Sequence, residues 1–317
     1  MSDKNATESL RADPPGISRA AEILRNEGIV AVPTETVYGL AARADSDLAV
    51  AKIYAAKGRP GLNPLIVHVA QMEQAEALAE FSQEARRVAA TVWPGAVTLV
   101  LPKRSDAPLA DSVSAGLSTI ALRMPDHPVM KAVIEEAGTA LAAPSANRSN
   151  TISPTTADHV AATLDGRIDL ILDGGECKKG LESSILAIRQ DGTWEELRPG
   201  PVDLDLLHQH FHGAPMRPAP AKEGIEAPGQ LKRHYSPGKP IRMGATAGKS
   251  DEFLIGFGPV ASDCTLSAKG DLGEAAARLY ACLHEAAQAV QPKIAIASIP
   301  AEGVGVAIND RLRRAAA

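Results

Sequence analysis

Residues 29–40 of this chain read IVAVPTETVYGL, an apolar run of strand length followed by a proline and a group of hydroxyl-bearing side chains. Proline cannot donate a hydrogen bond into a central strand, so the strand is expected to end at Pro33. Open α/β sheets bind their ligands at the carboxyl ends of strands. The stretch therefore predicts an α/β fold with a candidate site beside the threonines. The alternative is a polar turn, in which the threonines bond their own backbone and Gly39 serves the turn.

The surrounding sequence alternates short apolar runs with helix-period segments from residue 17 to about residue 205, as an α/β domain does. Strands are expected at residues 65–69, 97–101, 119–123, 141–143 and 170–173. Helices are expected at residues 18–27, 48–56 and 127–137. The mixture is too irregular for a simple doubly wound sheet.

The residue pattern changes at residues 206–240, which carry several prolines and no periodic apolar residues. A linker of this length is usually functional or disordered. Beyond it, strands are expected at residues 253–257 and 293–297, and helices at residues 273–290 and 304–314. The sequence thus predicts a domain at residues 10–205, a linker at residues 206–240 and a small second α/β domain at residues 241–317.

Of the 317 residues, 45% are hydrophobic and 22% are charged, as in ordinary globular proteins. The net charge of −5 excludes a strongly basic nucleic-acid clamp as the bulk character of the chain, and aromatic residues at 3% are too few for extended stacking platforms. Cys177, Cys264 and Cys282 lie too far apart for a zinc site or a disulfide framework, which favours a reducing compartment. With no apolar leader and no membrane-length apolar stretch, a cytoplasmic protein without a membrane segment is expected.

Two groups of residues could hold an anion or a polar ligand. Lys57 and Arg59 flank a glycine at a helix end, where cations also complement the helix dipole. The nearby Gly, Pro and Asn residues favour instead a fixed anion pocket. Ser145 and Asn147 follow a strand at spacing i, i+2 and would face one ligand if the chain stays extended, although a local turn explains them too. Arg198, before a turn, is open to the same two interpretations.

Several familiar motifs are absent from the sequence. It has no P-loop, no GxGxxG after a strand, no GxSxG elbow and no HExxH helix. His68 lies in an apolar strand, where a single histidine is more often part of the core than a ligand. The histidines near the linker lack cysteine or acidic partners at metal spacing, so no protein-bound metal is expected.

Taken together, the ordered segments resemble the Sua5/YrdC/YciO family. The matching stretches are PTETVYGL (33–40), KGRP (57–60) with NPL (63–65), WPG (93–95), RMP (123–125), APSANRS (143–149), ESS (182–184) and LRPGP (197–201). The linker segment KRHYSPGKP (232–240) is similar to that of the two-domain Sua5 branch. The resemblance implies a twisted mixed sheet with flanking helices, followed by a small Rossmann-like α/β domain.

The resemblance also implies a reaction. L-Threonine, bicarbonate and ATP would give L-threonylcarbamoyl-adenylate and pyrophosphate, for transfer to ANN-reading tRNAs by a downstream threonylcarbamoyl transferase complex, with tRNA itself as a further candidate partner. A carbamate approaching a triphosphate needs fixed cations, because like charges about 4 Å apart repel by about 4 kcal/mol at an effective dielectric constant near 20. We therefore expect Lys57, Arg59 and Arg198 to hold the triphosphate, with Mg²⁺ bridging its oxygens.

The family's site residues transfer to numbered positions of this chain. The expected catalytic pair is Lys57 and Arg59. The further ATP-binding residues implied are Asn63, Thr119, Ser145, Asn147, Arg198, His234 and Tyr235. The threonine-binding residues implied are Thr36, Tyr38, His68, Arg123 and Ser183. Arg123 would pair with the threonine carboxylate, and His234 and Tyr235 would close over the nucleotide as a lid.

Two other functions remain open from the sequence. One is an RNA- or tRNA-binding module with a local groove lined by Lys57, Arg59, Arg123 and Arg148. The other is a carbamoyl-adenylate former like the related domain of hydrogenase-maturation carbamoyltransferases, against which the missing acylphosphatase and zinc-finger regions argue.

Overall fold

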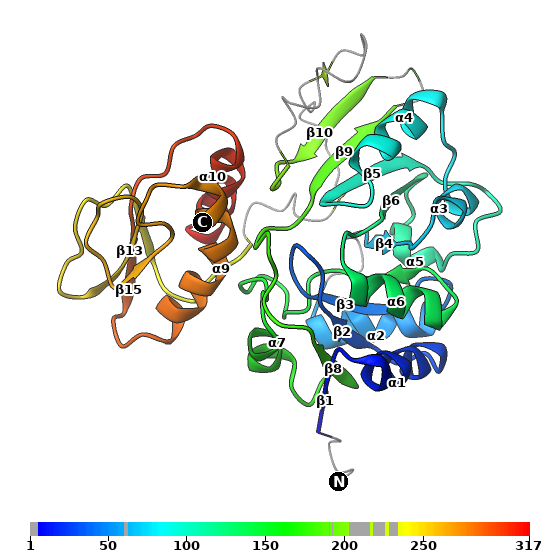
Figure 1. Cartoon of the computed structure of the whole chain (residues 1–317), viewed down its shortest axis with the longest axis horizontal. Helices are drawn as coiled ribbons and strands as arrows, with labels where there is room; N and C mark the ends of the chain where they lie inside the picture. Colours follow the sequence, from blue (N-terminus) through cyan, green and yellow to red (C-terminus); the bar gives the residue numbers. More distant parts are fainter. Residues whose placement is uncertain are drawn as a thin grey trace.

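The computed structural model describes residues 6–59, 63–189, 191, 193–202, 216–217, 226–227 and 234–317. They form a large α/β unit and a smaller α/β unit beside it (Figure 1). Most of the predicted linker, residues 206–240, lies outside the described residues. Within the described ranges, no helix has the length and apolar character needed to cross a membrane.

The large unit is built on one mixed sheet with the strand order β1-β8-β2-β3-β7-β4-β6-β5-β9-β10-β11. Its strands are β1 (Glu8–Arg11), β2 (Val30–Val32), β3 (Gly39–Arg43), β4 (Ile66–His68), β5 (Val97–Pro102), β6 (Thr119–Arg123), β7 (Leu141–Ala142), β8 (Leu170–Asp173), β9 (Ser184–Ile188), β10 (Trp194–Arg198) and β11 (Met216–Arg217). The sheet contains both parallel pairs, such as β4–β6, and antiparallel pairs, such as β5–β6. The predicted mixed α/β fold is confirmed.

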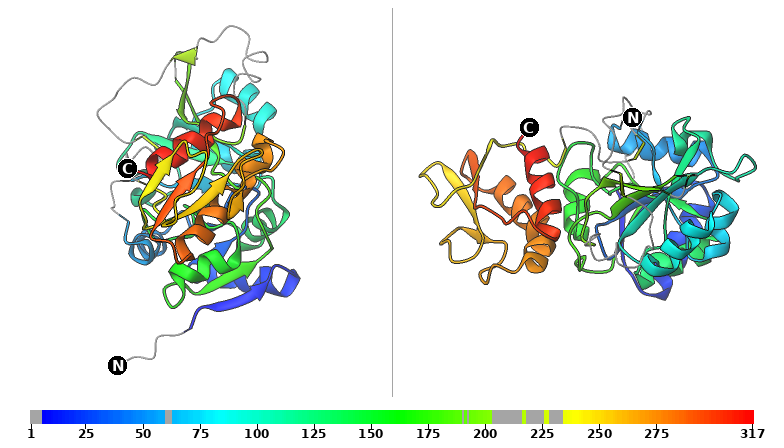
Figure 2. Two further views of the ribbon diagram at one scale, coloured as in Figure 1. Left: turned by 90° about the vertical axis from the view of Figure 1, so that its left-hand side faces the viewer. Right: turned by 90° about the horizontal axis from the view of Figure 1, so that it is seen from above.

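Helices cover this sheet on both sides (Figure 2). They are α1 (Pro14–Arg25), α2 (Asp47–Lys57), α3 (Met72–Leu78), α4 (Gln83–Val92), α5 (Asp111–Ser114), α6 (Pro128–Ala137) and α7 (Ala157–Leu164). Helix α1 begins four residues before the predicted start at residue 18, because the Asp13 side chain caps it and Pro14 occupies the first helical position.

The stretch at residues 29–40 contains both the strand and the polar turn that its sequence suggested. Strand β2 ends at Val32, before Pro33. The Thr34 hydroxyl donates to the Val37 carbonyl and accepts from the backbone N–H of Thr36, so the chain reverses in a threonine-centred turn. The chain then returns as β3, antiparallel to β2, a strand that the sequence interpretation missed.

The small unit has a four-stranded parallel sheet in the order β12-β15-β13-β14. Its elements are β12 (Ile241–Met243), β13 (Glu252–Gly256), β14 (Cys264–Thr265), α9 (Leu272–Gln288), β15 (Lys293–Ile296) and α10 (Val304–Ala315). The predicted β-α-β-α order lacked β12 and β14, which are only three and two residues long. The second α/β unit itself is confirmed.

Helices α9 and α10 lie on the side of the small unit that faces the large one (Figure 2). The two units share a buried apolar cluster, in which Val37 and Leu181 of the large unit pack with Leu279 and neighbouring residues of α9. Gly180, at φ +69°, lies so close to α9 that an added Cβ would be 2.4 Å from the Ala277 carbonyl oxygen. This close approach places the loop before β9 directly against the second unit.

Candidate active site

A cavity opens where several strands of the large sheet end. Because β4 and β6 are parallel with His68 opposite Arg123, both side chains reach the same edge of the sheet. Ser145 comes to this edge from the loop after β7, through a backbone bridge to Gly39. The lining residues that the sequence singled out are Thr36, Arg59, His68, Arg123, Ser145, Ser183, Arg198, His234 and Tyr235.

Arg123 is fixed in the cavity wall by three contacts. Its Nη2 lies 2.6 Å from Glu35 Oε1, Nη1 donates to the Thr36 hydroxyl at 2.9 Å, and Nε donates to the Gly95 carbonyl at 3.2 Å. Burial alone would raise the pKa of Glu35, but the charge and hydrogen bond of Arg123 outweigh it and hold that pKa below its usual value. Arg123 is therefore a cation whose charge is already balanced, and Glu35 is a partner that sequence reasoning missed.

His68 lies beside Arg123 as a neutral side chain. Burial, together with the charge of Arg123, lowers the pKa of His68 to about 3. Its Nδ1 is buried and has no hydrogen-bond partner in the part of the chain that the structure describes. The imidazole can therefore offer a hydrogen bond to a ligand without adding charge.

Arg59 and Arg198 bring positive charge to the cavity. Arg59 donates to the carbonyls of Asn63 and Pro64, the latter at 3.1 Å. Burial lowers the pKa of Arg59 to about 10, which still leaves it charged at neutral pH. Arg198 donates to the Ser183 carbonyl through Nε at 3.1 Å and Nη2 at 2.9 Å. The hydrogen bonds to these backbone carbonyls fix both guanidinium groups in the wall of the cavity.

Lys57 does not line the cavity. Its Nζ donates to the carbonyls of Ser145 at 2.5 Å and Asn147 at 2.6 Å, and burial lowers its pKa well below the usual value. Helix α2 ends here because Gly58 adopts the left-handed conformation of a helix cap. The side chain thus supports the turn that carries Ser145, one layer behind the surface of the cavity.

Asn147 is buried in the turn that Lys57 supports, and three further singled-out residues also lie away from the cavity surface. Asn63 is buried, and its backbone carbonyl accepts hydrogen bonds from the side chains of Arg59 and Tyr54. Thr119 begins β6, opposite Pro102. Tyr38 is fully buried and donates to the Gly175 carbonyl at 2.8 Å, so it does not form the wall expected for the threonine pocket.

The basic groove considered for RNA does not form as expected. Lys57 and Arg123 are buried and Arg59 is half-buried, whereas only Arg148 of the four is exposed. A polyanionic backbone at the surface would meet one of these cations rather than a row of them.

His234 and Tyr235 from the end of the linker contribute to the wall of the cavity. Their rings are in edge contact, with centroids 4.1 Å apart, and Tyr235 has an unusual φ of +64°. Burial lowers the pKa of His234 to about 3, so this side chain is neutral. The enclosed volume is about 50 Å³, far less than the roughly 300–1,000 Å³ of small-molecule sites.

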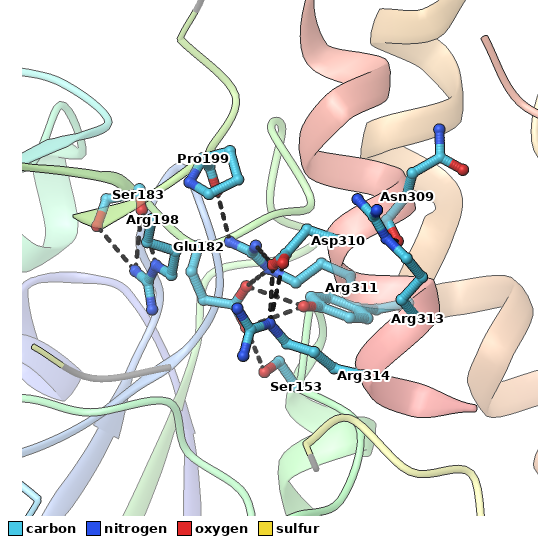
Figure 3. A network of polar contacts seen from close by, with 11 residues as sticks. Ser153, Glu182, Ser183, Arg198, Pro199, Asn309, Asp310, Arg311, Arg313 and Arg314 are labelled. Carbon is cyan, nitrogen blue, oxygen red and sulfur yellow. Dashed lines mark hydrogen bonds and ion pairs between the residues drawn. The ribbon is translucent and has the colours of Figure 1, made fainter. Parts of the chain in front are cut away.

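Glu182, whose role the sequence left unassigned, is the carboxylate that connects the cavity to the second unit (Figure 3). It accepts hydrogen bonds from Ser153, Tyr280 and Arg311. Burial would raise the pKa of Glu182, but Arg311 first, and then Arg198, lower it to about 2. The ESS stretch marked the position, but not its partners in α9 and α10.

No cluster of three or more His, Cys, Asp or Glu side chains within the described ranges could hold a metal ion. Glu182, the one carboxylate among the described residues that line the cavity, is paired with Arg311. A divalent cation here would depend on oxygen atoms of a bound ligand.

Comparison with known proteins gives full-length matches. The Sua5_yciO_yrdC family, described as "Telomere recombination", matches residues 22–200, and the family "Threonylcarbamoyl-AMP synthase, C-terminal domain" matches residues 202–317. A Bacillus subtilis protein named threonylcarbamoyl-AMP synthase is 39% identical over 98% of this chain and 96% of its own length. A Pyrococcus abyssi protein of the same name is 36% identical over 93% and 92%.

A crystal structure of Pyrococcus abyssi Sua5 complexed with L-threonine has a TM-score of 0.87 to this structure and 34% sequence identity, covering 98% of this chain and 96% of the other. The two family matches together extend over both units and include all of the described residues that line the cavity. On these matches, the chain belongs to the Sua5/YciO/YrdC family, in its two-domain branch.

Proposed function

We propose that this enzyme is an L-threonylcarbamoyladenylate synthase, a nucleotidyltransferase that joins L-threonine, bicarbonate and ATP into threonylcarbamoyl-AMP and releases pyrophosphate. The observation that carries the proposal is the convergence of Arg59, Arg123 and Arg198 with the neutral His68 on one cavity. The names of the matching relatives, and the L-threonine bound to the Pyrococcus abyssi protein, support this choice of reaction.

The threonine side of the proposed site is formed by Thr36, His68, Arg123 and Ser183. Arg123 would receive the α-carboxylate. The Ser183 hydroxyl, 2.7 Å from the Thr98 hydroxyl, and the Thr36 hydroxyl would hydrogen-bond the polar groups of the amino acid. A neutral His68 suits this role, since it adds no charge near the amine that must lose its proton.

The nucleotide side would be formed by Arg59 and Arg198 for the triphosphate, and by the Ser145 turn, which Lys57 and Asn147 support. Asn63, whose carbonyl accepts a hydrogen bond from Arg59, and Thr119 stay candidates for this side. Mg²⁺ would be carried by the phosphate oxygens, because the described residues around the cavity form no carboxylate cluster that could hold it. When bound, the ion would neutralise charge on the triphosphate.

The reaction requires two bond-forming steps. The deprotonated threonine amine attacks the bicarbonate carbon, forming the N–C bond of a carbamate with loss of water. A carbamate oxygen then attacks the α-phosphorus, and the bond from that phosphorus to the pyrophosphate oxygen breaks. The role of the protein is to hold the two anions in line and to stabilise the charge on the departing pyrophosphate.

His234 and Tyr235 would act as a lid over these substrates. A cavity of about 50 Å³ is too small for ATP and threonine together, which supports a linker end that would move outward for entry and return for the reaction. Return would exclude the water that otherwise hydrolyses the mixed anhydride. The product would then pass to a downstream threonylcarbamoyl transferase acting on tRNA in the cytoplasm.

Pyrophosphate release tests the proposal. The purified protein is incubated with ATP, bicarbonate and each amino acid in turn, and pyrophosphate is measured. Release that depends on bicarbonate and is selective for threonine supports the function, and Arg123→Ala should then raise the KM for threonine more than that for ATP. Release without bicarbonate, or with no preference for threonine, would overturn it.

A further inference from the structure

Arg311 is a fully buried cation that comes from the second unit and ends beside the candidate active site. It lies on α10, with no exposed surface, and its Nε donates to Glu182 Oε2 at 3.0 Å. Nη2 donates to the Pro199 carbonyl, immediately after Arg198, at 3.0 Å, and Nη1 pairs with Asp310 at 2.8 Å. Figure 3 shows this network between the two units.

The first consequence concerns the charge of the cavity. Glu182 lines the cavity, beside Ser183 and Arg198. Without Arg311, its carboxylate would be a buried negative charge next to the place proposed for a triphosphate, and would compete with that triphosphate for Arg198. Arg311 and Tyr280 engage both carboxylate oxygens from the far side.

The second consequence concerns the linker end. The Arg311 guanidinium lies over the Tyr235 ring at 5.4 Å from its centroid. Tyr280 stacks on the same ring, with centroids 5.7 Å apart. The backbone N–H of His234 donates to the carbonyl of Arg314. One face of α10 therefore holds both the carboxylate and the linker residues that line the cavity.

We propose that Arg311 is a positioning residue for ATP, which neutralises Glu182 and seats Tyr235 so that the nucleotide side of the cavity stays cationic. The second unit thus completes the active site electrostatically without touching the substrates. This inference rests on the proposed function, since it takes ATP as the ligand of that side.

Equilibrium binding of ATP, measured by titration calorimetry without threonine or bicarbonate, tests the inference. Arg311→Met should raise the Kd for ATP about tenfold or more, because the buried Glu182 carboxylate would then repel the triphosphate without compensation. The Kd for threonine should change less than about threefold. The double variant Glu182→Gln/Arg311→Met should bind ATP at least about threefold more tightly than Arg311→Met, because the uncompensated carboxylate is gone, and the lost contact of Arg311 with the Tyr235 ring accounts for the remaining difference from wild type. Arg313→Met, an exposed cation on the same helix, is the matched control.

A purely structural role for Arg311 predicts a different pattern. The double variant also lacks the ion pair between the units, so it would then bind ATP as poorly as Arg311→Met or worse, and that result overturns the inference. If Arg311→Met does not fold, Glu182→Gln alone decides: we expect it to bind ATP at least as tightly as wild type, and a tenfold loss would refute the argument. A wild-type protein that binds ATP but forms no product with threonine would refute the proposed function separately.

Discussion

Replacement of Glu35 by glutamine tests the charge balance on which the proposed threonine pocket depends. The Glu35 carboxylate lies 2.6 Å from Arg123, and the two side chains expose only 7% and 4% of their surface. Removing one partner of a buried ion pair costs about 3–5 kcal/mol, because the other charge stays buried without compensation. Glutamine keeps the shape and a carbonyl acceptor, so we expect a loss of about 3 kcal/mol in the free energy of unfolding at neutral pH.

The same substitution should tighten the binding of threonine. In the wild-type protein the threonine carboxylate would share Arg123 with Glu35, and like charges about 5 Å apart repel by about 3 kcal/mol at an effective dielectric constant near 20. Because relaxation recovers part of this, we expect the Kd for threonine to fall about tenfold. Turnover should fall as well, since Glu35 also orients the guanidinium group.

The dependence on pH has a defined sign. Because Arg123 holds the pKa of Glu35 below its ordinary value of 4.5, the ion pair stabilises the folded state above that value and loses its effect as the pH falls through the folded pKa. The difference in stability between wild type and Glu35→Gln should therefore shrink as the solution is acidified below about pH 4.5.

Denaturant unfolding and titration calorimetry measure these quantities. Glu195→Gln is the matched control, since Glu195 pairs with Arg189, which is 24% exposed. It should cost less and leave threonine binding unchanged. A Glu35→Gln protein that is as stable as wild type, or that binds threonine more weakly, would refute the reasoning.

Three further predictions concern the core of the site and its surroundings. His68→Leu should reduce the loss of stability that acidification below about pH 6.5 causes. Burial lowers the pKa of His68 to about 3, so the unfolded chain takes up a proton that the folded one does not. Parallel curves of Tm against pH for the two proteins would contradict this. Gly180→Ala should cost about 3 kcal/mol, because its Cβ would meet the Ala277 carbonyl at 2.4 Å. Gly116→Ala, at φ +79° with open space around it, should cost about 1 kcal/mol, and equal losses in urea unfolding would exclude the steric explanation. Lys57→Met should lower the free energy of unfolding by about 3 kcal/mol, because the carbonyls of Ser145 and Asn147 lose their donor. Unchanged stability in urea would show that the ammonium group does not support this turn.

The sequence predicts best the strands that are buried on both faces. β5 and β6 are mostly apolar, and their bounds differ from the predicted ranges by at most one residue. β10 reads WEELR, which carries no strand pattern. It forms because its backbone pairs with β9 and Trp194 is buried in the core. Such a strand depends on its neighbours rather than on its own residues.

The candidate site was predictable as a set of residues that follow strand ends. Nine of the singled-out side chains line one cavity. The sequence could not separate residues at the surface of the cavity from those behind it. Lys57 and Arg59 are both cations next to Gly58, and only the path of the backbone after α2 turns Arg59 toward the cavity and Lys57 away from it. It also could not reveal Glu35 or Arg311 as partners, since an ion pair between distant segments leaves no local pattern.

The two sides of the cavity differ in charge, and this difference assigns each side to one of the two proposed substrates. Arg123 is balanced by Glu35 and lies beside a neutral imidazole, so that side can pair with a single carboxylate but offers no net positive charge to a triphosphate. On the opposite side Arg198 lines the cavity, and the Glu182 carboxylate next to it is engaged by Arg311 of the second unit. His234 is neutral as well. Closure of the linker end would therefore exclude water and strengthen the attraction between arginine and phosphate, while leaving the charge balance of the cavity unchanged.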